Sequence, residues 1–487
     1  MLKLLQGRIL LEEELLSFLV VHKVIEMDED YHGEPTAKMR SQCLQWITRL
    51  ANDYPVILKK GIEKDQCNRC GAGKQYIHWV SCARCKQQCG YCERCLLMGK
   101  CRSCTRLYLF PLIEGDSSSF YTNSTTNIHL PTLTKFQNDA LEKLIEFYQE
   151  PGTKDFLLWA VCGAGKTEVI YPLISLARKR KHKVLWATPR RDVVLELAPR
   201  LQKVFTDTAI AVLYGGCENR WSNGDIVLST THQALRFYHC FDLVIIDEID
   251  AFPFHNDPML PYVVARACKE RGKTIYLTAT PRESLKKRIK RGWKDSRFLP
   301  HYKLPVRYHG FPLPVPKIQL ESKLGKRMKE INKIPVLESF LNRLRDERHP
   351  GFIFLPSVQA LPQVKKYILK QDPYWDGRLE MVHASDPLRE EKVMAIRKGE
   401  IQVLLTTTIL ERGVTIPRIS LLVFQADAPI FDEASLVQIA GRAGRSAQCP
   451  TGEIIFLAED ITRAMKGAIG QIKEMNRLAR KKGYLNY

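Results

Sequence analysis

Short apolar runs that stop abruptly at small, polar or charged residues recur through the last three quarters of the chain. Four of them cover residues 156–159, 243–246, 275–277 and 403–405. Runs without polar alternation are typical of strands buried on both faces, and helical stretches separate them here. Strands that alternate with helices predict parallel sheets, and therefore an α/β fold.

The run at 156–159 leads into residues 160–167, where two glycines and a lysine precede a helical segment. Such a turn aims backbone N–H groups and a helix N-terminus at a polyphosphate. Lys166 would reach the outer phosphates, and the Thr167 hydroxyl would join the coordination sphere of magnesium. The competing interpretation is a glycine-rich turn with a surface lysine. We expect a nucleotide-binding loop made of Ala160, Gly163, Ala164, Gly165, Lys166 and Thr167, with Ala160 in place of the usual first glycine.

Two carboxylates, Asp247 and Glu248, end the apolar run at 243–246. The first would hold magnesium, and the second would orient or deprotonate the attacking water. A solvated acidic turn would not need a buried strand before it. With Lys166, these residues predict hydrolysis of ATP.

Two further motifs follow at residues 278–280 and 438–445. In this order the segments resemble superfamily 2 helicases and translocases, which carry AxxGxGKT, DExx, TAT and QxxGRxGR on two RecA-like lobes. The resemblance covers residues 131–460 and implies that Gln137 reads the adenine edge. It also implies that Gln438, Arg442 and Arg445 complete the catalytic site from the second lobe. Guanidinium groups stay charged and bind phosphate oxygens in a forked geometry, so lobe closure and hydrolysis would be linked.

The same resemblance implies a nucleic-acid-binding face. Two segments of the first lobe would hold phosphates through backbone amides and hydroxyls, and a segment at 406–414 would couple nucleotide state to the bound strand. For this last segment, a charge-rich turn after a buried strand is the alternative. The expected DNA-binding residues are Thr188, Pro189, Arg190, Thr230, Thr231, Thr407 and Arg412.

Charge also favours a nucleic-acid partner. The 487 residues contain 74 Lys and Arg against 53 Asp and Glu, a formal net charge of +21. Such an excess would steer the protein towards phosphate backbones and make binding dependent on salt. Each basic run taken singly, such as that at 178–183, is equally typical of a solvated helix face.

The chain lacks the roughly 18 consecutive apolar residues that a membrane-spanning helix needs. An apolar run at 15–21 follows three glutamates, whereas a signal peptide would have positive charge there. We expect a cytoplasmic protein, with peripheral association at the inner face of the cell membrane left open.

Nine of the fifteen cysteines fall between Cys67 and Cys104, mostly as CxxC pairs. In a cytosolic chain such pairs indicate zinc sites rather than disulfides, and a redox dithiol is the alternative for a single pair. Alternate pairing would give two tetrahedral sites and leave Cys89 over; the other possibility is one site, with the remaining cysteines in a less regular second site or none. The expected metal ligands are Cys67, Cys70, Cys82, Cys85, Cys92, Cys95, Cys101 and Cys104.

Aromatic and basic residues alternate through this cysteine-rich segment, among them His78, Trp79, Tyr91 and Lys86. Aromatic faces stack on unpaired bases while cations follow the phosphates, which suits single strands. In a small metal-bound module, however, aromatics also form much of the core.

These patterns predict four parts. Residues 1–60 form a helical accessory segment and 61–110 a cysteine-rich zinc module. Residues 131–297 form a first RecA-like lobe that binds ATP. Residues 325–487 form a second, helicase C-terminal lobe, beyond a proline-rich segment.

A cysteine module placed before such a motor resembles the ComFA family of late-competence ATP-dependent helicases or translocases. The strings around Cys67-Asn68-Arg69-Cys70 and Cys92-Glu93-Arg94-Cys95 carry that resemblance. It implies ATP-driven uptake of single-stranded DNA, with competence proteins and a membrane DNA channel as partners and an oligomer left open. The implied cofactors are ATP, magnesium and zinc.

Three alternatives stay open at this point. A PriA-like replication-restart helicase also has zinc-binding cysteines, but those interrupt the motor, and no comparable cluster lies between Asp247 and Arg445. An RNA helicase is a second possibility. A zinc-dependent nucleic-acid-binding scaffold with a vestigial ATPase is the third, although such a scaffold need not keep Lys166 or the paired carboxylates. The sequence does not predict the direction of stepping, whether the strands are separated, or the oligomeric state.

Overall fold

A computed structural model describes residues 1–28, 35–113, 128–254, 256–292, 295–408 and 416–486. It contains two compact units, each of which is described by itself. Unit 1 consists of Met1–Pro131, Lys143–Leu157 and Ile170–Leu277, and unit 2 of Thr132–Glu142, Leu158–Val169 and Thr278–Tyr487. The predicted nucleotide-binding loop therefore belongs to the same unit as the second lobe.

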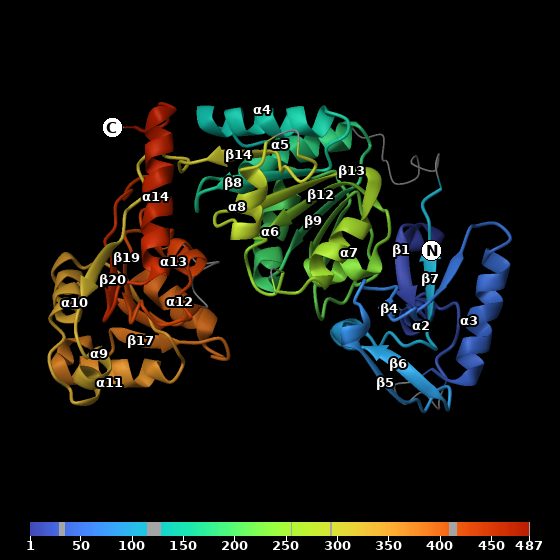
Figure 1. Cartoon of the computed structure of the whole chain (residues 1–487), viewed down its shortest axis with the longest axis horizontal. Coiled ribbons are helices and arrows are strands. Elements are labelled where there is room, and N and C mark those ends of the chain that lie inside the picture. Colours follow the sequence, from blue (N-terminus) through green and yellow to red (C-terminus); the bar gives the residue numbers. More distant parts are fainter. Residues whose placement is uncertain (29–34, 114–127, 255, 293–294, 409–415, 487) are drawn as a thin grey trace. The chain divides into compact units, whose positions relative to one another are not determined.

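The N-terminal part of unit 1 mixes helices with a small antiparallel sheet (Figure 1). Its helices are α1 (Leu2–Leu5), α2 (Glu12–Val21) and α3 (Ala37–Leu50). Strand β7 (Arg106–Phe110) lies between β1 (Arg8–Leu11) and β2 (Ile57–Lys60) and pairs antiparallel with both. Apolar side chains from α2, α3 and β7 pack around Trp221 of the following lobe.

The cysteine-rich module sits between β2 and β7 and is built from short elements. Two hairpins pair β3 (Ile62–Glu63) with β4 (Gln66–Cys67), and β5 (Ile77–Ser81) with β6 (Gln88–Cys92). Two short 3₁₀ helices, η1 (Lys74–Tyr76) and η2 (Glu93–Met98), complete it. Hairpins this short are marginal on their own, so something besides backbone pairing must hold the module together.

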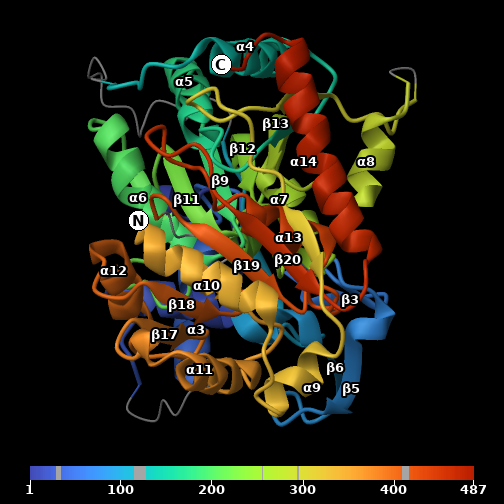
Figure 2. The same cartoon turned by 90° about the vertical axis from the view of Figure 1, so that its left-hand side faces the viewer.

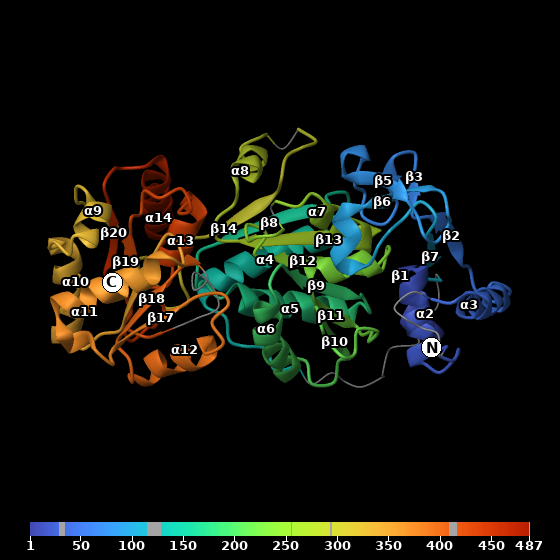
Figure 3. The same ribbon diagram turned by 90° about the horizontal axis from the view of Figure 1, so that it is seen from below.

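The first lobe is a sheet with the strand order β10-β11-β9-β12-β13-β8-β14. Its strands are β8 (Asp155–Ala160), β9 (Val184–Thr188), β10 (Ile210–Leu213), β11 (Ile226–Thr230), β12 (Phe241–Asp247), β13 (Cys268–Thr278) and β14 (His301–Leu304). Strands β9 and β11 are buried at every position, as their uninterrupted apolar runs require. Figure 3 shows β9, β11 and β12 side by side, with α6 (Arg191–Val204) packed on β9–β11.

The helical elements around this sheet connect its strands. They are α4 (Lys135–Gln149), α5 (Lys166–Lys179), η4 (Thr231–Arg236), α7 (Met259–Ala267) and α8 (Glu283–Ile289). Helix α5 follows β8 directly after the glycine-containing turn, and η4 follows β11 without an intervening residue. Both therefore start at the carboxyl ends of parallel strands, where ligands of open α/β sheets bind.

The second lobe is a six-stranded parallel sheet with the order β15-β20-β19-β16-β18-β17. Figure 2 labels its strands β17 to β20. Its strands are β15 (Lys317–Leu320), β16 (Gly351–Phe354), β17 (Leu379–Val382), β18 (Val403–Thr406), β19 (Ser420–Phe424) and β20 (Ile454–Ala458). Its helices are α9 (Leu324–Lys329), α10 (Pro335–Glu347), α11 (Ala360–Gln371), α12 (Arg389–Lys398), α13 (Glu433–Ala440) and α14 (Arg463–Lys481), with the short turn η5 (Pro373–Trp375).

The predicted fold class is confirmed: two parallel-sheet lobes, an N-terminal helical segment and a cysteine cluster suited to a metal. The N-terminal segment also contributes two strands, which its helical patterning did not indicate. No helix within the described ranges is long and apolar enough to cross a membrane.

Candidate nucleotide and metal sites

The nucleotide-binding loop forms the predicted strand, turn and helix. Gly163 and Gly165 both have positive φ, +81° and +78°, a backbone conformation that residues with a Cβ rarely adopt. Ala160 ends β8, Ala164 is fully buried in the turn, and Lys166 and Thr167 begin α5. The N-terminus of α5 therefore carries the side chains expected to bind phosphate and magnesium.

Gln137 on α4 is bonded to this loop. Its Nε2 donates to the Ala164 carbonyl at 2.9 Å, and its Oε1 accepts from the Thr134 N–H at 2.9 Å. A Cβ on Gly165 would overlap Gln137 Nε2, so any other residue there would displace the end of this side chain. The loop is thus braced from α4, and the side chain predicted to read adenine touches the loop's backbone.

Arg307, a residue that no motif indicated, joins the loop to the arginine-bearing segment that follows α13. It is fully buried and donates to three carbonyls: from Nε to Cys162 at 3.1 Å, from Nη1 to Ala443 at 2.6 Å and from Nη2 to Gly441 at 3.2 Å. Burial, and then the neighbouring Arg445, lower the pKa of Arg307 to about 10. The guanidinium nevertheless stays charged at neutral pH, so these are charge-assisted hydrogen bonds.

The predicted catalytic Gln438 lies at the same junction. Cys162 Sγ donates to Gln438 Oε1 at 3.0 Å, and Gln438 Nε2 donates to Thr280 Oγ1 at 3.4 Å. Arg442 is buried, whereas Arg445 is half-buried and donates from Nε to the Gly441 carbonyl at 2.9 Å. Within unit 2, three of the predicted segments thus meet: the loop, the Thr278–Thr280 turn and the segment from Gln438 to Arg445.

The predicted carboxylates lie in unit 1, at the carboxyl end of β12. Asp247 is the last residue of that strand and is buried, and its Oδ1 accepts from the Glu248 N–H at 2.9 Å. Glu248 has φ +54°, which is rare for a residue with a side chain and is often found at functional sites. Because of this sharp turn, two carboxylates that are adjacent in sequence both lie at the end of β12.

The residues expected to bind DNA in the first lobe end neighbouring strands. Thr188 ends β9 and pairs with Thr230, which ends β11. Pro189 and Arg190 follow β9, and Thr231 begins η4. Thr188 and Thr231 are fully buried, whereas Arg190 is half-buried. Thr407 follows β18 and is half-buried, and Arg412 lies outside the described residues.

One group of four cysteines has the geometry of a tetrahedral metal site. The Sγ atoms of Cys67, Cys70, Cys92 and Cys95 all lie within 4.8 Å of one another. Two of the separations, Cys67 to Cys95 and Cys70 to Cys92, are 3.7 Å and 3.5 Å. Zinc bonded to sulfur at about 2.3 Å would place two ligands of a tetrahedron about 3.8 Å apart. The donor set and its spacing therefore fit zinc.

A second group of four differs from the alternate pairing expected from sequence. It consists of Cys82, Cys85, Cys89 and Cys104, with the Sγ atoms of Cys82 and Cys104 3.9 Å apart. Cys101 instead lies beside the first group, where its Sγ is 3.6 Å from that of Cys67 and donates to the Gly61 carbonyl at 3.3 Å. The hairpin β5–β6 brings Cys89 round to the second group, a pairing that CxxC spacing alone does not reveal.

Three consecutive glutamates at the start of α2, Glu12, Glu13 and Glu14, hold the loops of both cysteine groups; we call them the acidic triplet. Arg84, between Cys82 and Cys85, contacts Glu12 and donates to Glu13 at 2.9 Å. Arg69, between Cys67 and Cys70, lies 2.8 Å from Glu14. This role was missed from the sequence, although arginine stands at the third position of both of these CxxC loops.

The two lobes and the phosphate-binding loop place the protein in the class of superfamily 2 helicases. Residues 130–283 match the family model for the type III restriction enzyme res subunit, and residues 332–447 match the helicase conserved C-terminal domain. Dbp5 of S. cerevisiae, in a structure with RNA and ADP BeF3, shares the fold with a TM-score of 0.51 at 16% identity, over 72% of this chain and 93% of that one.

Similarity to known proteins identifies the family within this class. Residues 1–109 match the competence protein ComFA N-terminal domain. Competence protein ComFA of Bacillus subtilis is 38% identical over 422 residues, 85% of this chain and 86% of that protein. ComFA of Streptococcus pneumoniae is 37% identical over 389 residues, 80% of this chain and 86% of that protein. The chain belongs to the ComFA family, which confirms the resemblance drawn from its motifs. It is a competence-associated, ATP-binding helicase.

Proposed function

We propose that this protein is a DNA-dependent ATPase that moves single-stranded DNA into the cytoplasm during natural transformation. The observation that carries the proposal is the junction around Arg307. There the nucleotide-binding loop, through Cys162, is bonded to the segment that bears Arg442 and Arg445. A cleft with such a junction would change shape when phosphate is bound or released, which links hydrolysis to movement.

Each catalytic group has a defined task in this proposal. Lys166 would bind the outer phosphates, and Thr167 and Asp247 would hold magnesium. Glu248 positions the attacking water, while Arg442 and Arg445 stabilise charge on the transferred phosphoryl group. Magnesium would neutralise phosphate charge when bound. Gln137 and Gln438 keep the loop in place for this chemistry, and Gln137 is proposed to reach the adenine edge as well.

Strand binding is proposed at the carboxyl ends of β9 and β11 and at the segment after β18. Backbone N–H groups and hydroxyls at Thr188, Thr230 and Thr231 would contact phosphates, and Pro189, which has no N–H, would shape the turn after β9. Arg190, Thr407 and Arg412 would add side-chain contacts. Trp79 on β5 is 55% exposed, although it pairs with Gly90 across the hairpin. We propose that its indole stacks on an unpaired base, so that the cysteine module forms part of the strand path.

Zinc is proposed as the ion of both cysteine groups, with a structural task. Tetrahedral thiolate sites of this kind supply folding free energy to modules whose apolar core is small. The expected partners of the loaded protein are other competence proteins and a membrane DNA channel, reached from the cytoplasmic face of the cell membrane. The chain is basic, which suits that surface as well as DNA.

Two other functions are less well supported. A replication-restart role would be expected of cysteines that interrupt the motor, and here the module precedes it. A scaffold with a vestigial ATPase would not need the bonded loop, or two carboxylates at the end of β12. RNA stays a substrate to be tested, because Dbp5 was solved with RNA and shares the fold.

The deciding experiment is steady-state ATP hydrolysis with no nucleic acid, single-stranded DNA, duplex DNA and single-stranded RNA, at two salt concentrations. Stimulation by single-stranded DNA that Glu248→Gln abolishes is the expected result. Wild-type turnover in Lys166→Ala would contradict the motor. Preference for RNA would overturn the substrate, and no hydrolysis by folded, metal-loaded protein would favour the scaffold.

A further inference from the structure

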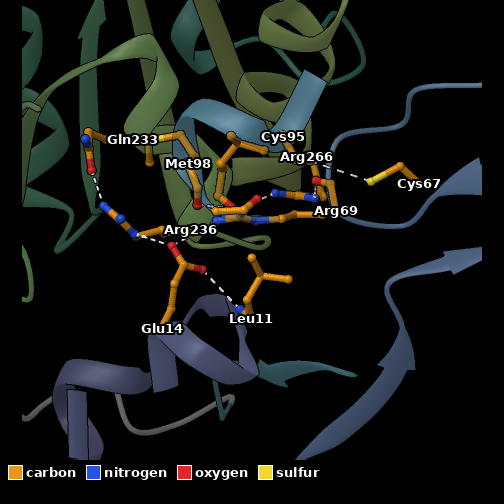
Figure 4. A network of polar contacts seen from close by, with 11 residues as sticks. Leu11, Glu14, Cys67, Arg69, Cys95, Met98, Gln233, Arg236 and Arg266 are labelled. Carbon is orange, nitrogen blue, oxygen red and sulfur yellow. Dashed lines mark hydrogen bonds and ion pairs between the residues drawn. The ribbon is translucent and has the colours of Figure 1, made fainter. Parts of the chain in front are cut away.

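Glu14 of the acidic triplet joins the first cysteine group to the predicted strand-binding turn of unit 1. Its Oε1 lies 2.8 Å from Arg69 Nη2 and 2.8 Å from Arg236 Nε, and its Oε2 accepts from the Leu11 N–H at 3.0 Å (Figure 4). Its side chain is only 10% exposed. A single buried carboxylate therefore connects a CxxC loop with the last residue of η4.

At one end of this network, Arg236 belongs to the turn that is expected to bind DNA. Arg236 ends η4, and its Nη1 donates to Gln233 within the same turn. Helix η4 begins at Thr231, directly after β11 ends at Thr230. Because η4 is a single short 3₁₀ element, the position of Arg236 sets the position of the backbone from Thr231 onward.

The other end of the network is held by the metal-ligand loops. Arg69 donates from Nη1 to the carbonyls of Met98 at 2.8 Å and Gly99 at 3.2 Å, at the end of η2, which contains Cys95. Its own carbonyl accepts from Arg266 Nη1, while Arg266 Nη2 donates to the Leu235 carbonyl at 2.9 Å. Arg266, which lies beside Arg69 in Figure 4, thus makes a second connection between the CxxC loop and η4.

Positive charge is in excess in this network. Arg69, Arg236 and Arg266 are all buried. Glu14 pairs with Arg69 and Arg236, and Arg266 donates to backbone carbonyls, so these four residues carry a formal excess of two positive charges. Arg8, also fully buried, adds a fourth cation next to Trp221. Buried charges without compensation are costly. Burial lowers the pKa of Arg266 to about 10, and burial opposes the ionisation of Glu14, although Arg69 and Arg236 outweigh it and lower the pKa of Glu14.

The first cysteine group can supply the missing negative charge. Four thiolates around one divalent zinc ion carry a formal charge of minus two, whereas four protonated thiols carry none. Arg69 stands between two of the ligands in sequence, Cys67 and Cys70. Metal loading therefore both shapes the loop that holds Arg69 and compensates the arginines that hold η4.

We propose that metal in the Cys67–Cys70–Cys92–Cys95 site fixes η4 through Arg69 and Glu14, and so sets how tightly the motor holds single-stranded DNA. Glu14 and Arg69 are then positioning residues, and the cysteine module regulates the strand-binding turn beyond any contact it makes with DNA itself. The strand-affinity part of this inference rests on the proposed function; the link between metal and η4 does not.

The structural arm of the test is hydrogen–deuterium exchange of peptides that cover residues 231–236. Glu14→Gln, which keeps the shape but removes the charge, should raise exchange there about tenfold with metal content unchanged. Removal of the metal from wild type should do the same. Glu13→Gln is the matched control, because Glu13 holds Arg84 of the second group and not Arg236. Unchanged exchange in both Glu14→Gln and metal-free protein, or equal effects of the two variants, would overturn the proposal.

The functional arm measures ATP hydrolysis against the concentration of a single-stranded oligonucleotide. Glu14→Gln should raise the half-saturating concentration about tenfold and leave turnover without DNA unchanged, whereas Glu13→Gln should match wild type. Arg236→Lys, which keeps the charge but loses the forked geometry, replaces Glu14→Gln if that variant does not fold. Wild type that DNA does not stimulate would reject the proposed function, and exchange at η4 would still decide the coupling. Normal half-saturation despite loosened η4 would overturn the affinity part.

Discussion

Arg307 shows how much a single residue outside every motif contributes to the nucleotide half of the site. Its three carbonyl partners belong to two segments almost 280 residues apart in sequence, so no local pattern marks it as a link. Sequence could identify Lys166, Gln438 and Arg445 because their chemistry needs fixed spacing. The guanidinium that holds the segments together needs only its buried position, which depends on the tertiary fold.

Replacing this guanidinium should weaken both fold and catalysis. Arg307→Met leaves the buried carbonyls of Cys162 and Ala443 without this donor and leaves that of Gly441 with Arg445 alone. We therefore expect a loss of about 2–4 kcal/mol in the free energy of unfolding and at least about tenfold lower turnover. Chemical denaturation and steady-state hydrolysis check this. Arg307→Lys should recover stability only in part, and a fully active Arg307→Met would show that the junction is dispensable.

His309, two residues further on, predicts a dependence of stability on pH. Its Nδ1 accepts from the Phe311 N–H and its Nε2 contacts the Gly444 carbonyl, an arrangement that suits the neutral ring. Burial lowers its pKa, although the Gly444 carbonyl opposes the shift and Arg307 adds to it. The unfolded chain then binds more protons below about pH 6.5, so stability is present above that pH and falls as pH drops through it. Thermal unfolding of His309→Gln should show a shallower loss between about pH 6.5 and 5.

The buried strands of both lobes were the most predictable elements. The apolar runs at 156–159 and 403–405 lie within β8 and β18, because a strand covered on both faces needs apolar residues throughout. Strand β1 was not foreseen, since its four buried residues run directly into α2 and its partner β7 lies about a hundred residues away. The spacing of the cysteines did not predict which of them share a group, for a similar reason. The position of Cys89 depends on the β5–β6 hairpin and not on the number of residues between cysteines.

The cysteine module gives a direct test of the observed pairing. Wild type should contain two zinc ions per chain, Cys89→Ser should contain one, and Cys101→Ser should keep both, because Cys101 lies beside the first group without being needed as its fourth ligand. Metal content after exhaustive dialysis, measured by mass spectrometry, checks this. The reverse result, with Cys101→Ser losing a zinc and Cys89→Ser keeping two, would restore the alternate pairing.

Strand β5 offers a second test at this scale. Trp79→Ala should weaken binding of a single-stranded oligonucleotide roughly tenfold, the loss expected for one stacked base. Stacking involves no counterions, so the decrease should be similar at low and high salt. Fluorescence anisotropy at several salt concentrations measures both quantities. Replacement of Val80, 45% exposed on the same strand, by Ala is the matched control and should have little effect.

The charge of the whole molecule predicts how binding responds to salt. With 74 basic and 53 acidic residues, contacts to the phosphate backbone should supply a large share of affinity. For three or more phosphates neutralised on a single strand, affinity should fall by about tenfold or more between 50 and 200 mM salt. A titration of labelled oligonucleotide at four salt concentrations gives the slope. A flat response would mean that the excess charge serves another surface, such as a membrane.

The small N-terminal sheet has a consequence for the history of the molecule. Lys60, the last residue of β2, stands opposite Arg106, the first residue of β7, and Gly61 donates to the Thr105 carbonyl at 2.7 Å. The cysteine-rich segment is therefore inserted between two residues, Lys60 and Arg106, that pair directly across adjacent strands. A tight turn between these two strands could replace the whole segment. An ancestor could therefore have gained, lost or exchanged the segment as a unit while β2 and β7 kept their register.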